Sequence, residues 1–312
     1  MGQGEKRGCF KVGCLSSLGG CAVLVLVIVV LLGIGLLTGF GDERFEAVDR
    51  AHAVTAPPAT PRIAAEAHVA EPGRIVLDVT RGSFSIRPGP PGEPVRLEGE
   101  YNAGTFELEE EFEAYGESGW IYRVSFDQRG FGIRPFVQHG DDRNRLTLIV
   151  PRDTPVVLEG MVGLGESEFE LGGLWIAEID LDYGIGEHAL SFAEPLPLPM
   201  KRLRLDTSIG ALDVDSLGNA SPRLVEIRHT VGETRIDLRG SWRQDAEVHI
   251  WCGIGQCDVR VPDDVNVELQ RASVLIGETG SSLRRNHAEP NPEAPTLELS
   301  VSAKIGQLNV GR

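Results

Sequence analysis

Apolar and polar residues alternate along the C-terminal half of the chain in blocks that are each centred on a glycine. In every block a large aliphatic residue stands immediately before that glycine. Successive glycines are 21, 24, 22, 23, 22 and 29 residues apart, and they are Gly165, Gly186, Gly210, Gly232, Gly255, Gly277 and Gly306. A recurrence of roughly 20 to 50 residues is the sequence signature of a repeat protein. Each block is therefore expected to form one structural unit.

The apolar positions within a block have the period of two that is typical of β-strands with one buried face. Apolar residues stand seven and five positions before the glycine, for example Ile179 and Leu181, and four positions after it, for example Leu190. The glycine is expected at a bend in the strand, because it accepts φ values that a side chain forbids. The residue directly before it continues the odd-numbered series, so this column is expected to face inward: Leu164, Ile185, Ile209, Val231, Ile254, Ile276 and Ile305.

One such unit cannot bury its apolar face alone, whereas stacked units build a continuous core. The sequence therefore predicts an all-β fold, a single-stranded β-solenoid with about 22 residues per coil. A β-sandwich of hairpins is the alternative, because strand, glycine turn and strand also describe a hairpin. Hairpin turns commonly contain Asn-Gly or Asp-Gly, whereas the residue before glycine is aliphatic here, which favours the solenoid.

Residues 74–150 follow the repeat less closely than the regular solenoid predicted for 151–312, and the segment around Gly82 is expected to be one degenerate unit. The aromatic-rich stretch 115–142 breaks the period. We interpret it either as a cap over the solenoid end or as a contact surface on the regular scaffold. The side chains expected on such a partner surface are Trp120, Tyr122, Phe126, Phe131 and Phe136.

Residues 21–40 form an uncharged apolar run of 20 residues, enough for one transmembrane helix. Basic residues precede this run and acidic residues follow it, which predicts a cytoplasmic N-terminus (1–20) and a periplasmic or extracellular bulk of the chain. A cleaved signal peptide is the alternative, although its apolar run is usually shorter. Gly35 and Gly39 have the small-xxx-small spacing that allows close helix packing and hence homo-oligomers. The Ala- and Pro-rich residues 41–73 are expected to be a linker.

The net charge and the missing motifs exclude several classes of partner and of functional site. The chain has a formal net charge of -16 at pH 7. Nucleic acid is not expected as a partner, because its binding requires a basic surface. Neither a glycine-rich phosphate loop nor a nucleophile elbow stands in a strand-to-helix context, and the glycine-aspartate repeat of calcium-binding β-rolls is absent. We therefore expect no catalytic residue, no metal and no cofactor.

Cys252 and Cys257 stand three residues before and two residues after the same glycine, Gly255. Outside the cytoplasm they could form a disulfide if their Cα atoms lie within about 7 Å, and the alternative is a pair of small buried thiols. His229 falls in the column of Cys252 one unit earlier, which suggests a metal site. A closed zinc site needs four ligands, so a hydrogen-bonded interior histidine is the favoured interpretation.

Two segments share the order strand, Val-Pro turn and strand, namely 148–159 (LIVPRDTPVVLE) and 261–269 (VPDDVNVEL). With this phrase and the repeat, residues 74–312 resemble bacterial toastrack-type adhesin domains and are similar to the C-terminal domain of LiaF-like envelope-stress proteins. The resemblance implies a non-enzymatic binding, adhesin-like or scaffold protein that contacts another envelope protein or a cell-wall polymer. A LiaF-like signalling accessory is the alternative, and a polysaccharide-acting β-helix enzyme is a more distant one.

Overall fold

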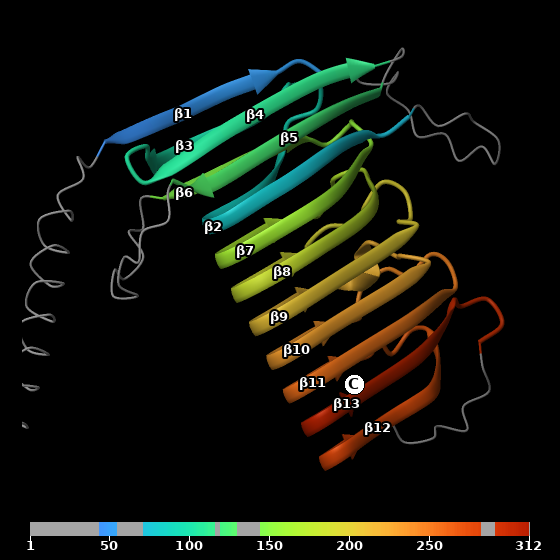
Figure 1. Ribbon diagram of the computed structural model, residues 1–312. Coiled ribbons are helices and arrows are strands. Elements are labelled where there is room, and N and C mark those ends of the chain that lie inside the picture. Colours follow the sequence, from blue (N-terminus) through green and yellow to red (C-terminus); the bar gives the residue numbers. More distant parts are fainter. Residues whose placement is uncertain (1–43, 55–70, 116–118, 130–143, 282–290, 312) are drawn as a thin grey trace, which may run out of the picture. The chain divides into compact units, whose positions relative to one another are not determined.

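The computed structural model describes residues 44–54, 71–115, 119–129, 144–281 and 291–311 (Figure 1). Besides the strands, these residues contain one short 3₁₀ turn, Leu217–Asn219. The fold of the described residues is all-β, as predicted. The strands are β1 (Phe45–His52), β2 (Gly73–Gly89), β3 (Val95–Asn102), β4 (Phe106–Tyr115), β5 (Gly119–Gln128), β6 (Arg145–Pro151), β7 (Val156–Glu170), β8 (Ile176–Ser191), β9 (Arg202–Asp215), β10 (Leu224–Asp237), β11 (Ala246–Arg260), β12 (Asn266–Ser281) and β13 (Thr296–Gly311).

A membrane-crossing helix is not found among the residues that the structure describes, because no helix there has the required length and hydropathy. The apolar segment 21–40 lies outside these residues, together with Gly35 and Gly39. The anchor, its orientation and the helix contact therefore stay predictions.

The strands form one hydrogen-bonded sheet with the order β1-β3-β6-β2-β7-β8-β9-β10-β11-β13-β12, which β4 and β5 join through β2. In this order, every pair of neighbouring strands from β2 to β12 is parallel. From Gly82 of β2 onward, the repeat glycines of adjacent strands lie opposite each other. Strands of a hairpin pair antiparallel, so this pairing fits coils and not the sandwich of hairpins. The last two strands are exchanged in order, because β13 lies between β11 and β12.

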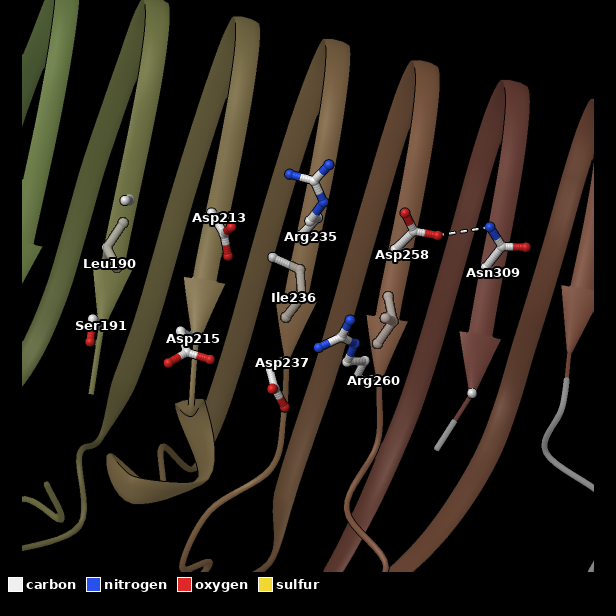
Figure 2. Close-up of a pocket in the computed structure, with 13 residues that line it drawn as sticks. Leu190, Ser191, Asp213, Asp215, Arg235, Ile236, Asp237, Asp258, Arg260 and Asn309 are labelled. Atoms are coloured by element: carbon white, nitrogen blue, oxygen red, sulfur yellow. Dashed lines mark hydrogen bonds between the residues drawn. The ribbon is translucent and has the colours of Figure 1, made fainter. Parts of the chain in front are cut away.

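The long strands are bent, as Figure 2 shows for the middle of the sheet. The repeat glycines from Gly82 to Gly306 have φ between +131° and +157°. A Cβ atom placed on any of them from Gly165 onward would lie 1.7 to 2.1 Å from the carbonyl oxygen of the glycine on a neighbouring strand. Glycine is therefore required at the bend both by backbone conformation and by the close approach of the next strand.

The core is built from columns of side chains that continue from strand to strand. On β8, Ile179, Leu181 and Tyr183 before the bend and His188 and Leu190 after it are buried. Equivalent positions on β7, β9, β10 and β11 are buried as well, except for the half-buried Gly160 of β7. Each coil therefore contributes inward side chains from both parts of its bent strand.

The aliphatic residue directly before each repeat glycine does not belong to this core. Leu164, Ile185, Ile209, Ile254, Ile276 and Ile305 are 37% to 61% exposed, and Val231 is half-buried. The prediction that this column faces inward is therefore wrong. The reason is the bend: the step from the inward side chain of Tyr183 to that of His188 is five positions, whereas it is two in a straight strand, and Ile185 is left on the outer side of the corner.

The N-terminal end of the parallel stack is closed by antiparallel strands (Figure 1). β1 pairs with β3, β3 with β6, and β4 with β5, all antiparallel. Part of the predicted linker 41–73 is thus a strand, because residues 45–52 form β1 and pair with the whole of β3. Residues 55–70 of that linker lie outside the described residues.

The aromatic residues of β5 form the core of this closed end. Trp120, Tyr122 and Phe126 are at most 2% exposed, and the ring of Phe126 stacks on that of Phe106 with a centroid distance of 4.9 Å. The prediction that these three residues form a partner surface is wrong, because rings from β1, β3 and β4 pack against them: His52 on Tyr122, Tyr101 on Phe126 and Phe112 on Trp120. Phe131 and Phe136 lie outside the described residues.

Candidate binding surface

The exposed aliphatic residues at the bends form one continuous row, which we call the aliphatic ridge. Strand register places each member directly opposite the next, in the order Leu164, Ile185, Ile209, Val231, Ile254, Ile305 and Ile276. With about 4.8 Å between neighbouring strands, this row extends over roughly 29 Å. Arg81 of β2 lies opposite Leu164, so a charged residue ends the ridge on the capped side.

Further apolar side chains widen the ridge. Met161 and Trp251 each stand three residues before a ridge residue, and they are 43% and 40% exposed. Single exposed apolar side chains are ordinary on a protein surface, whereas contiguous apolar rows mark contact sites. The ridge is therefore the apolar part of the candidate binding surface.

The outer face before the bend carries charges that pair between strands. Arg202 of β9 donates a hydrogen bond of 2.7 Å to Glu226 of β10. Arg204 of β9 contacts Asp180 and, at 3.2 Å, Asp182 of β8. These partly exposed pairs each contribute at most about 1 kcal/mol. Asp180 and Asp182 thus share an arginine partner.

The outer face after the bend contains a hollow of about 670 Å³ across β8, β9, β10, β11 and β13. Figure 2 shows Asp213, Arg235, Asp258 and Asn309 following one another across neighbouring strands, and Asn309 donates a 2.7 Å hydrogen bond to Asp258. The small residue Ala189 continues this row on β8 and leaves room above the backbone. The hollow therefore offers carboxylate, guanidinium and amide groups in one row.

The surroundings of Asp213 in this hollow shift the pKa of its carboxyl group. Partial burial raises its pKa, Arg235 opposes the shift, and nearby Asp215 raises the pKa further. No aromatic side chain lines the hollow. It is therefore suited to hydrogen bonding with a polar partner and not to stacking on one.

The inside of the bend contains polar side chains that sequence analysis treated only in part. The hydroxyl of Ser167 and Nδ1 of His188 lie 3.0 Å apart, and the His188 ring stacks on Tyr183 with a centroid distance of 4.3 Å. Burial lowers the pKa of His188 to about 4. Nδ1 of His229 hydrogen-bonds the hydroxyl of Thr234 at 2.7 Å, so His229 is the hydrogen-bonded interior residue that was expected.

Cys252 and Cys257 are buried and are free thiols in the structure. A hydrogen bond between the two thiols lowers the pKa of Cys252 and raises that of Cys257, and burial raises the latter further. Within the described ranges, no group of three or more His, Cys, Asp or Glu residues is placed to hold a metal ion. The arrangement with His229 therefore gives no metal site among these residues.

Sequence reasoning grouped the ridge residues correctly and assigned them to the wrong side, and it missed the polar hollow. The available signal for the hollow is the change from glutamate to small residues at outward positions after the bend. Glu168 on β7 is followed in the same row by Ala189 on β8, which lines the hollow.

No family model and no curated protein matches this chain. A solved structure of a candidate cell-adhesion protein from Clostridium sporogenes is 13% identical, with a TM-score of 0.44 over 86% of this chain and 99% of that chain. A candidate adhesin from Bacteroides fragilis is 10% identical, with a TM-score of 0.36 over 86% of this chain and 98% of that chain. With TM-scores below 0.5, these similarities establish neither the fold nor the function of this chain.

Proposed function

We propose that this chain is a non-enzymatic, adhesin-like binding or scaffold protein. In this proposal a β-solenoid displays the aliphatic ridge to a partner protein outside the cytoplasm, and segment 21–40 anchors it in the membrane. The continuous exposure of the ridge carries the proposal. An apolar row of this length is costly to leave in water, and contiguous apolar surface on a monomer marks a contact site.

The surroundings of the ridge indicate the chemistry of the partner. Glu166, Glu187 and Glu233 each stand two residues after a ridge residue and border it on one side. Charges at the rim of an interface steer encounter and exclude wrong partners more than they add affinity. The partner that fits is a protein with an apolar strip and basic residues along one of its borders.

The rigidity of the scaffold supports the same function. Every bend glycine from Gly165 to Gly306 is held against a neighbouring strand, so the ridge residues keep fixed spacing. A preorganised surface loses less conformational entropy on binding than a flexible one. An extended, fixed row therefore suits a partner with a matching repeat or a long straight element.

The test compares two lysine substitutions on the same strand of the full-length chain. Ile254→Lys places a charge on the ridge, whereas His249→Lys places one at an exposed position of β11 five residues earlier. Tagged proteins are expressed in the native host and purified from detergent-solubilised membranes. We expect wild type and His249→Lys to retain the same partner, and Ile254→Lys to lose it. Retention of the same partner by Ile254→Lys, or purification of wild type without any partner, would refute the proposal.

A further inference from the structure

The two ends of the parallel stack differ in how they are closed. At one end β5 and β6 pair with β2, and antiparallel strands cover them. At the other end β12 pairs with β13, and no described strand pairs with its far edge. Stacked-repeat proteins need a closing element at each end, and an open strand edge is a template for pairing.

Apolar side chains of β12 are exposed at this end of the described residues. Val274 and Leu269 lie opposite Ala303 and Leu299 of β13 in the inward columns. Leu299 is fully buried, whereas Leu269 is 39% exposed. Leu275, at 73%, is the most exposed large apolar side chain of the described residues. Apolar surface is therefore concentrated where backbone groups are also unpaired.

The shape of β12 selects among partners for this edge. The strand bends at Gly277, where φ is +140°, so a straight strand from another protein could pair with only one of its two parts. A second copy of β12 carries the same bend. Two copies related by a two-fold axis pair antiparallel, which brings their bends together. A register with Val274 opposite the partner subunit's Thr279 keeps the inward side chains of both strands on the core side.

The charge of β12 also favours a second copy. The protein has a net charge of -16, which opposes contact between most parts of two copies. Among its 16 residues β12 carries only Glu268, Arg271 and Glu278, and the six residues from Ala272 to Gly277 have no charge. Edge strands that avoid pairing usually carry charged or proline residues at their centre.

From this end of the stack we propose that two copies of the chain associate through the free edges of β12. The paired edges continue the sheet from one subunit into the other and bury Leu275 and Ile276. The proposed contact shares only Ile276, the ridge residue of β12, with the partner contact of the ridge. Ridge variants away from β12 therefore separate the two.

Sedimentation velocity of the full-length chain in detergent, over a range of concentrations, tests the proposal. We expect a monomer–dimer equilibrium for wild type. Leu275→Glu should weaken it by at least about tenfold, because the new carboxylate faces the partner subunit's Glu278 and like charges opposite each other destabilise strand pairing. Leu275→Lys removes the same apolar surface but meets that glutamate favourably, so it should weaken association less.

Two controls locate the contact. Ile209→Glu makes the same kind of change on the ridge in the middle of the stack, and Gly35→Leu with Gly39→Leu alters the predicted membrane contact. Both should leave the equilibrium unchanged. Hydrogen exchange should show slower exchange of residues 266–281 as concentration rises, with residues 224–237 unchanged. A monomer at all concentrations, or association that is lost in either control and kept in Leu275→Glu, would overturn the proposal.

Discussion

Replacing a bend glycine by alanine tests the physical basis of the whole stack. In Gly232→Ala the new Cβ atom would lie 1.8 Å from the carbonyl oxygen of Gly210, and φ at this position is +142°. Holding a side-chain-bearing residue in this region of φ costs about 1 to 3 kcal/mol. The contact must be relieved by moving one strand away from the next, and overpacking of this kind typically costs about 1 to 3 kcal/mol more. We expect the variant to lose about 2 to 6 kcal/mol of unfolding free energy.

Two other glycines separate these contributions. Gly92 has φ of +76°, and no atom lies within 4 Å of its added Cβ, so Gly92→Ala tests backbone strain alone. Gly253 has φ outside the positive range, and its added Cβ would lie 2.1 Å from the carbonyl oxygen of Thr230, so Gly253→Ala tests the contact alone. Each is expected to cost about 1 to 2 kcal/mol.

Urea unfolding of the full-length variants, followed by circular dichroism near 218 nm as is usual for β-sheet, gives the three free energies by linear extrapolation. The reasoning requires the loss in Gly232→Ala to exceed that of each single-factor variant. If Gly232→Ala loses no more than Gly92→Ala, the strands are not held together as closely as described, and the explanation of the bend fails.

Three further predictions concern the interior. Burial lowers the pKa of His188 from 6.5 to about 4, so between these pH values the unfolded chain binds more protons than the folded chain. The free energy of unfolding should therefore fall as pH decreases from 6.5 to 4. His188→Leu, which copies Leu212 of the next strand, should reduce this pH dependence in urea titrations at each pH. Cys252 and Cys257 are buried free thiols, so both should react with a maleimide slowly in the native protein and fast in urea. If the two cysteines do not react in urea in the absence of reductant, they form a disulfide instead. Phe126→Ala should lower the unfolding free energy by about 3 to 5 kcal/mol, because it leaves a cavity at a fully buried position against Phe106 and Tyr101. An unchanged urea midpoint would show that the capped end does not unfold cooperatively with the rest of the sheet.

The parallel stack could be predicted because each coil repeats the same local requirement. Period-two burial and a glycine at each bend are visible in residues such as Leu181, Gly186 and Leu190, and the degenerate unit around Gly82 does lie in register with Gly165. The exchanged order of β12 and β13 was not predictable in this way. Both strands carry the same pattern, so the pattern alone does not determine which of them lies at the edge.

The capped end shows a different limit of sequence reasoning. Trp120, Tyr122 and Phe126 stand at even-numbered steps along β5, which identifies one buried face but not the neighbour that buries it. The sequence pattern of an aromatic strand face is the same whether a hairpin of the same chain or another protein covers it. Rings from three other strands supply the cover here, namely His52 of β1, Tyr101 of β3 and Phe106 of β4.

The ridge residues were assigned to the wrong side because the alternation of side chains does not show, at a bend, which residues face inward and which face outward. Inward residues stand at odd distances before the glycine and at even distances after it. Between the last inward residue before the bend and the first one after it, the chain must therefore advance by an odd number of positions. A step of three from Ile185 to His188 satisfies this parity as well as the observed step of five from Tyr183 to His188. What distinguishes them is the direction of the bend, because a residue at its outer side cannot reach a core that lies inside it. An aliphatic residue next to a bend glycine therefore carries no information about burial by itself, and in this protein that ambiguity conceals the surface on which the proposed function rests.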